Sequence, residues 1–141
     1  GFWAAPYEQA AEFGGRPMGG GPGDLPLGIP PESRIGGHTC IGVVATNAAL
    51  DKTALRQVAA MAHDGLARAI RPVHTPFDGD TIFALATAAW QDTRGGDAKP
   101  WLIARVGSIA ADCVARAVGR GVWMAEPLGT LGNARQALPK S

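Results

Sequence analysis

Three residues that could carry out nucleophilic or acid–base chemistry stand side by side in the segment SRIGGHTCIGVVATNA, residues 33–48. They are His38, Thr39 and Cys40, and they fall where a Gly/Pro-rich stretch meets an apolar run. A threonine hydroxyl is a poor nucleophile near pH 7 unless a base lies beside it, and a cysteine must first lose its proton. The segment therefore offers two rival nucleophiles, Thr39 and Cys40.

A second group of such residues lies in HTPFDGD, residues 74–80. Its His74 and Asp78 could complete a thiol triad with Cys40. Against this, Cys40 opens a run typical of a buried strand, and buried cysteines are usually inert. Asp-Gly is also common in turns, so Asp78 and Asp80 could form a turn and nothing more. The residues alone leave these interpretations open.

The elements that must position these residues alternate in type. CIGVVATNA and TIFALATAA, residues 40–48 and 81–89, are continuous apolar runs of the kind found in buried strands. Asp51 is a plausible N-cap for a helix over residues 52–70, and Pro100 fits the first turn of a helix to about residue 119. Helices that alternate with strands predict an α/β fold, most simply a layered sandwich.

Each predicted helix has an apolar face. The predicted faces are Leu55, Val58, Ala59, Ala62, Leu66 and Ile70 on the first helix, and Leu102, Val106, Ile109, Ala110, Cys113 and Ala117 on the second. Asp112 and Arg116 are spaced as an i,i+4 ion pair on the other side of the second helix.

The first part of the chain differs in character from the rest. GFWAAPYE reads as a strand already under way with no Met before it, which predicts a fragment of a longer protein. Residues 14–37 are rich in Gly and Pro without a period, which predicts an exposed connector, with a functional lid as the alternative. No Gly-Lys-Ser/Thr follows, so this stretch is not a phosphate-binding loop.

Composition excludes several classes of function. The chain has 141 residues, 46% of them apolar, enough for one globular domain with a core. Its 13 basic and 12 acidic residues are mixed along the chain and give a net charge of +1, which favours neither nucleic acid nor an anionic membrane as partner. No apolar run approaches the roughly 20 residues of a membrane span.

The cysteines and histidines predict no metal site or cofactor. Cys40 and Cys113 lack metal-type spacing and are expected to be free thiols in a reducing, cytoplasmic compartment. His63 and His74 lack the closely spaced partners of a zinc site and are expected at the surface. The four tryptophans are expected to serve packing or subunit contact rather than substrate stacking.

Residues 39–88, and MAHDGLARAIRPVHTPFDGDT at 61–81 above all, resemble the self-processing family that contains L-aminopeptidase D-amidase/D-esterase and the nylon oligomer (6-aminohexanoate-oligomer) hydrolase. FWAAPYEQAAEFGG, residues 2–15, resembles the segment that this family carries shortly before its processing point. The resemblance implies an α-β-β-α sandwich, of which this chain supplies a C-terminal part. It also implies that the chain is cut before a Ser or Thr that becomes a new N-terminus.

In this sequence the family's nucleophile falls on Thr39, and the processing site on His38–Thr39. Residues 1–38 would end the large subunit, and residues 39–141 would form the small one. Cutting creates the missing base, because an N-terminal α-amine with a pKa near 8 can accept the hydroxyl proton. The nylon-hydrolase branch has Asn before its nucleophile; His38 is compatible with cleavage because the carbonyl attacked belongs to the backbone.

The resemblance further assigns Asp78 and Asp80 to orienting the amine and hydroxyl of Thr39 and stabilising the ammonium. A Lys and an Asn of the family's active site lie upstream, in the remainder of the precursor, which is therefore an expected partner. The expected function is hydrolysis of small peptides, amino-acid amides or 6-aminohexanoate oligomers through an acyl-enzyme, by a homo-oligomer of processed heterodimers. The alternatives are acyl transfer of the glutamate N-acetyltransferase type and a non-catalytic structural or binding domain.

Overall fold

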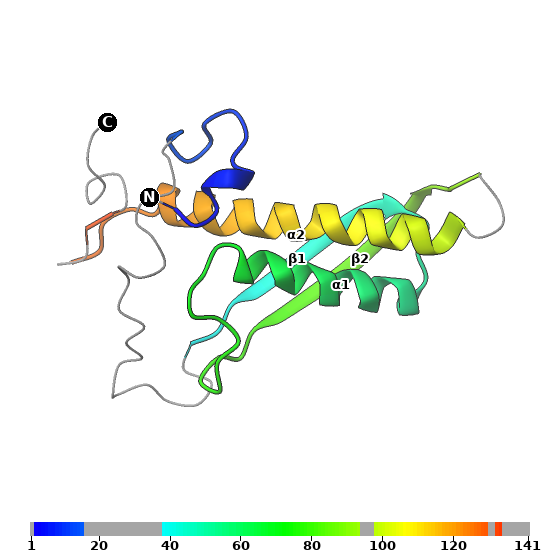
Figure 1. Cartoon of the computed structure of the whole chain (residues 1–141), viewed down its shortest axis with the longest axis horizontal. Coiled ribbons are helices and arrows are strands. Elements are labelled where there is room, and N and C mark those ends of the chain that lie inside the picture. Colours follow the sequence, from blue (N-terminus) through cyan, green and yellow to red (C-terminus); the bar gives the residue numbers. More distant parts are fainter. Residues whose placement is uncertain (1, 16–37, 94–97, 130–131, 134–141) are drawn as a thin grey trace.

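The computed structural model describes residues 2–15, 38–93, 98–129 and 132–133. Most of the predicted connector, residues 16–37, lies outside the described residues. The elements are a short 3-10 helix η1 (Ala5–Tyr7), strand β1 (Ile41–Ala48), helix α1 (Lys52–Ala67), strand β2 (Thr81–Trp90) and helix α2 (Ala98–Met124), as Figure 1 shows. The two predicted strands and two predicted helices are confirmed, with shifts at their ends.

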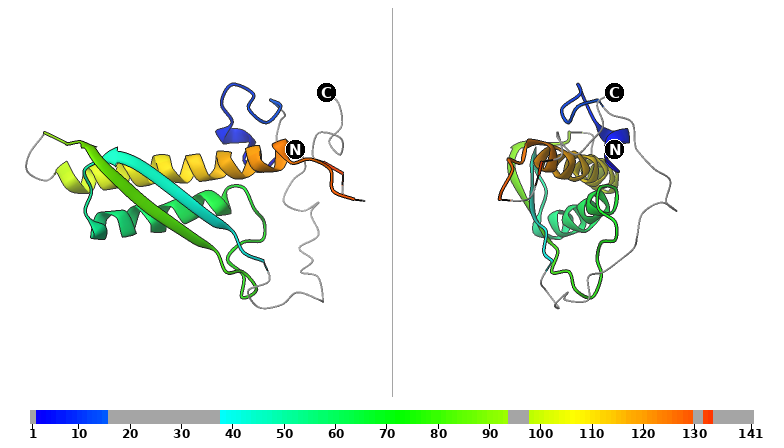
Figure 2. Two further views of the ribbon diagram at one scale, coloured as in Figure 1. Left: turned by 180° about the vertical axis from the view of Figure 1, so that it is seen from behind. Right: turned by 90° about the vertical axis from the view of Figure 1, so that its left-hand side faces the viewer.

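Strands β1 and β2 form a parallel pair in which Ile41 lies opposite Thr81 and Val43 lies opposite Phe83. Both helices lie on the same side of this pair, as the views in Figure 2 show. The α/β class is therefore confirmed. Within the described ranges the strands form one two-stranded sheet, so the chain supplies a sheet layer and a helix layer.

Helix α1 begins where the sequence predicts. The Asp51 carboxylate accepts a hydrogen bond from the backbone N–H of Ala54 at 2.9 Å, which satisfies one of the free N–H groups of the first turn. The helix ends at Ala67, three residues before the predicted end, and the Leu66 carbonyl accepts the N–H groups of both Ala69 and Ile70.

The two helices pack closely over the sheet. Gly65 of α1 permits this, because a Cβ there would lie 2.2 Å from the Ala111 carbonyl oxygen of α2. The core between sheet and helices is a cluster of Val44, Val58, Ala62, Leu66, Ile82, Ala110 and Val114, and a second buried cluster joins Ala4 and Phe13 to Ala115 of α2. Among the described residues, no helix is both long and apolar enough to cross a membrane.

The predicted apolar face of α2 is partly wrong. Leu102 and Ala110 are buried as expected, but Ile109, Cys113 and Ala117 are exposed. Buried Ala111, Val114 and Ala115 take their place. Helix α2 is apolar on more than one side, so its sequence period does not determine which side faces α1.

The predicted N-terminal strand is also wrong. Residues 2–15 form η1 and turns, in which the Glu8 carboxylate accepts the backbone N–H groups of Phe13 at 2.7 Å and Gly15 at 2.9 Å. These side-chain acceptors replace a strand partner. Phe13 is fully buried and packs against Gly119 of α2.

The ion pairs of α2 join it to other segments. Arg116 binds the Glu12 carboxylate through two nitrogens, at 2.6 and 3.1 Å. Asp112 binds Arg68 at 2.6 Å. The pair predicted between Asp112 and Arg116 is therefore replaced by two pairs that tie α2 to the N-terminal segment and to the end of α1.

The outer face of the sheet is apolar and exposed. Ile41 is 74% exposed, Val43 62% and Phe83 58%. These side chains lie on the face opposite the helices, because side chains alternate along a strand and Val44 and Ile82 fill the core.

Candidate active site

The parallel register brings the two groups of candidate residues together. β1 begins at Ile41 and β2 at Thr81, and these residues lie opposite each other. The residues just before each strand therefore meet at the same end of the sheet, where His38 pairs with Asp78 in an isolated parallel bridge. Thr39 is thus placed beside the Asp78–Asp80 segment, although about forty positions separate the two in sequence.

The hydroxyl of Thr39 lies directly against Gly79. A Cβ at position 79 would lie 2.7 Å from Thr39 Oγ1, closer than a Cβ normally approaches any atom. The backbone N–H of Gly79 donates to the carbonyl oxygen of His38 at 3.0 Å. Gly79 therefore touches both the candidate nucleophile and the peptide group that precedes it.

The carboxylate of Asp80 is nearly buried, with a side chain only 6% exposed. Its Oδ1 accepts the backbone N–H of Cys40 at 3.0 Å, and its Oδ2 lies 2.8 Å from His74 Nδ1. The imidazole of His74 also lies 5.2 Å from that of His63, measured between ring centroids. Asp80 is therefore held in one orientation, with its carboxylate against the backbone of Cys40, the residue that follows Thr39.

Asp78 makes different contacts. Its Oδ2 accepts the backbone N–H of Thr75 at 2.6 Å, and its own N–H donates to the Thr75 carbonyl at 3.0 Å. These bonds close a turn before β2, as the simpler interpretation of the Asp-Gly sequence expects. Asp78 lies beside His38 in the bridge between the two segments. Its role in orienting Thr39 stays a prediction.

The geometry disfavours Cys40 as nucleophile. Burial raises the pKa of the Cys40 thiol, and the negative charges of Asp80 and Asp78, with a hydrogen bond to Asp80, raise it further. A raised pKa keeps the thiol protonated and unreactive. In the imagined triad His74 would pair with Asp78, but in the structure it pairs with Asp80.

Sequence reasoning correctly placed His74 at the surface but missed its contact with Asp80, and it gave no role to Gly79. The signal for both was the alignment of the two predicted strands: if they pair in parallel from their first residues, the segments before them must meet. In the described ranges, no group of three or more His, Cys, Asp or Glu side chains is arranged to hold a metal ion.

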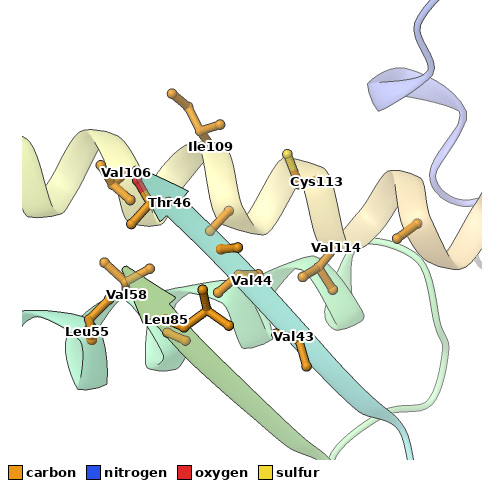
Figure 3. A pocket seen from close by; sticks show the side chains of 14 residues that line it. Val43, Val44, Thr46, Leu55, Val58, Leu85, Val106, Ile109, Cys113 and Val114 are labelled. Carbon is orange, nitrogen blue, oxygen red and sulfur yellow. The ribbon is translucent and has the colours of Figure 1, made fainter. Parts of the chain in front are cut away.

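A cavity of about 350 Å³ lies elsewhere, between the sheet and helices α1 and α2. Figure 3 shows its apolar lining, which includes Val44, Val58, Val106 and Val114. Thr39, Asp78 and Asp80 are not among its lining residues. The cavity is therefore a gap in the packing between the sheet and the helices. The candidate site is the end of the sheet at Thr39.

This chain is similar to known proteins of one peptidase family. The sequence model of peptidase family S58 matches residues 6–135. An uncharacterised aminopeptidase of Mycobacterium tuberculosis is 49% identical over 108 residues, which cover 72% of this chain and 31% of the relative. One from Mycobacterium leprae is 52% identical over 95 residues, 63% of this chain and 26% of the relative.

A more distant relative is the 6-aminohexanoate-oligomer endohydrolase of Paenarthrobacter ureafaciens, which is 39% identical over 59 residues, 42% of this chain and 16% of the relative. The chain thus spans less than a third of the length of the relatives it matches. Because the family match covers most of the sequence, this chain belongs to peptidase family S58.

Proposed function

We propose that this chain is the C-terminal part of a self-processing amide or peptide hydrolase whose nucleophile is Thr39. The observation that carries the proposal is the contact of Thr39 Oγ1 with Gly79, the residue between Asp78 and Asp80 in the sequence. The names of the relatives, aminopeptidase and 6-aminohexanoate-oligomer endohydrolase, support amide-bond hydrolysis as the reaction.

The proposed activation begins with a cut between His38 and Thr39. After the cut, Thr39 carries an α-amine next to its hydroxyl, and this amine accepts the hydroxyl proton as the oxygen attacks a substrate carbonyl. The acyl group then sits on Thr39 Oγ until water releases it. Residues 39–141 form the small subunit in this scheme, and residues 1–38 end the large one.

Asp80 is proposed to orient the new N-terminus. Its Oδ1 already binds the N–H of Cys40, the residue next to Thr39. Asp80 is therefore proposed to lie near the amine of Thr39. A buried carboxylate there favours the ammonium form of the amine once it has taken the proton. Asp78 is proposed to contribute charge at the same point and to hold the turn that carries Gly79.

The proposed complete fold is an α-β-β-α sandwich. Its support is the outer face of the sheet, where Ile41, Val43 and Phe83 are exposed. An apolar sheet face of this kind is normally covered in a folded protein. The covering layer is proposed to come from the remainder of the precursor, together with the Lys and Asn that the family resemblance implies.

The proposed substrates are small peptides, amino-acid amides and linear aliphatic amide oligomers. The test is the intact mass of the full-length protein during incubation, with activity assayed on the same samples. A fragment that begins TCIGVV should appear together with activity, and Thr39→Ala should abolish both, whereas Thr39→Ser should keep part of each because a hydroxyl and an amine remain. Activity from an uncut chain would overturn the proposal.

A further inference from the structure

We propose that the backbone N–H of Gly79 is the donor that stabilises the oxyanion formed on His38 during self-cleavage. The inference rests on the proposed cut before Thr39. It adds a group that sequence reasoning did not assign, because the group is a backbone N–H and leaves no mark in side-chain types.

The ladder at the start of the two strands fixes the position of the His38 carbonyl. His38 N–H donates to the Phe77 carbonyl at 3.4 Å, and Gly79 N–H donates to the His38 carbonyl at 3.0 Å. The next bond along the ladder runs from Thr81 N–H to the Cys40 carbonyl at 2.9 Å. The peptide bond to be cut is therefore held between two cross-strand hydrogen bonds, and the carbonyl oxygen is directed at one N–H.

The chemistry gives this N–H a specific task. Thr39 Oγ attacks the carbonyl carbon of His38, and the carbonyl oxygen takes up the negative charge. The bond from this carbon to the Thr39 nitrogen then breaks, the nitrogen gains one proton in place of the one that the hydroxyl loses, and an ester remains on Oγ. Water hydrolyses the ester to a His38 carboxyl and the free hydroxyl. The Gly79 hydrogen bond strengthens as charge develops on the oxygen, which is how a donor lowers a barrier.

Glycine at position 79 allows the hydroxyl and the donor to share one small volume. The Cβ of any other residue would lie 2.7 Å from Thr39 Oγ1 and would displace it. The backbone at Gly79 is not in the positive-φ region, so other residues could adopt its conformation. The requirement is therefore for space beside the nucleophile.

The test removes the N–H without adding atoms. In the full-length protein made by cell-free translation, glycolic acid at position 79 replaces this N–H by an ester oxygen. The matched control is the hydroxy-acid analogue of threonine at position 81, which removes the next N–H of the same ladder but does not touch His38. The rate of appearance of the TCIGVV fragment is measured by mass, and thermal unfolding checks that both chains fold.

The ester at position 79 should slow self-cleavage at least about 100-fold, the usual effect of losing one oxyanion donor. The ester at position 81 should stay within about threefold of wild type, since it loses only a structural hydrogen bond. Equal rates for the two esters would overturn the inference while leaving the proposed function intact. A wild-type chain that is active yet stays uncut would instead overturn the proposed function.

A second variant keeps the inference testable if the protein with an ester at position 79 does not fold. Gly79→Ala keeps the N–H but places a methyl group against Thr39 Oγ1, so cleavage should again slow at least about 100-fold. The matched variant is Gly121→Ala, because a Cβ at Gly121 would meet no atom within 4 Å. Cleavage of a folded Gly79→Ala chain at the wild-type rate would contradict the arrangement of hydroxyl and donor on which the inference depends.

Discussion

His74 Nδ1 lies 2.8 Å from Asp80 Oδ2, so a loop histidine holds the carboxylate that also binds the backbone beside Thr39. His74 has φ +58°, a left-handed conformation that is uncommon outside Gly and in which Asn, Asp and His are enriched. The backbone of the loop is therefore set so that this ring reaches Asp80. In the proposed mechanism His74 is a positioning residue, which acts on Thr39 only through Asp80.

Replacement of His74 should accordingly slow self-cleavage without abolishing it. We expect His74→Gly to lower the rate about tenfold or more, because Asp80 loses its hydrogen bond to His74 while the backbone keeps its conformation. His74→Asn should recover part of the rate, since its amide can donate to Asp80 and Asn tolerates positive φ. The rate is followed by the mass of the new fragment. Equal rates in the two variants would show that donation to Asp80 is unimportant.

The acidic pair should be essential for amide hydrolysis. Asp80→Asn and Asp78→Asn should each lower the rate at least about 100-fold, the range for lost electrostatic or acid–base groups. Asp64→Asn, at an exposed carboxylate of α1, is the matched control and should keep the wild-type rate. The measurement is release of amine from a small peptide amide by the processed enzyme. If folded Asp78→Asn keeps the wild-type rate, Asp78 serves only to form the turn before β2.

The Cys40 thiol should react slowly with alkylating agents. Burial, reinforced by Asp80 and Asp78, raises its pKa, and the thiolate is the reactive form. The alkylation rate of the Cys40 peptide, measured by mass spectrometry across a pH series, should therefore reach its half-maximum at a higher pH than in the denatured chain. A half-maximum at lower pH would restore Cys40 as a candidate nucleophile.

Two glycines of the helices should respond oppositely to alanine. Gly65→Ala places a Cβ 2.2 Å from the Ala111 carbonyl oxygen and should lower the free energy of unfolding by about 1–3 kcal/mol as the helices are forced apart. Gly121→Ala meets nothing within 4 Å on α2 and should raise it by up to about 1 kcal/mol, because alanine favours helix. Urea unfolding measures both. A stabilising Gly65→Ala would contradict the close approach of α1 and α2.

The contribution of the Glu12–Arg116 pair to stability should depend on pH. The hydrogen bond from Arg116 holds the pKa of Glu12 below its ordinary value of 4.5. A lowered folded-state pKa gives stability that is complete above the unfolded value and is lost as pH falls through the folded one. The melting temperature of wild type should therefore exceed that of Glu12→Gln at neutral pH, and the gap should close as the pH falls from 4.5 through the lowered pKa of Glu12. A gap unchanged by acid would exclude this ion pair as its source.

The sequence predicted the central elements because their signals are local. The strands at Val43 and Phe83 are continuous apolar runs, and Asp51 caps α1 as its position indicates. The orientation of α2 was missed, since Ile109 and Ala110 are both apolar and only contact with α1 decides between them. The N-terminal strand was missed because Glu8 supplies acceptors that a strand partner would otherwise provide.

The residues of the candidate site were named through family resemblance, and local sequence pattern did not reveal their contacts. Nothing in local pattern connects Thr39 with Gly79, because their contact follows from the parallel register of two strands that are separated by a helix. The resemblance named Thr39, Asp78 and Asp80, and the family membership behind it is confirmed. The parts played by Gly79 and His74 depend on a backbone N–H and a loop conformation, which residue types do not reveal.

The N-terminal segment is attached to α2 by the buried ring of Phe13 and by the Glu12–Arg116 pair. While residue 38 is joined to residue 39, these contacts form within one polypeptide and do not depend on its concentration. A cut at that bond would turn them into an association between two polypeptides, whose occupancy falls on dilution. The aromatic ring and the ion pair would then be among the contacts that hold the two polypeptides together as a heterodimer on dilution.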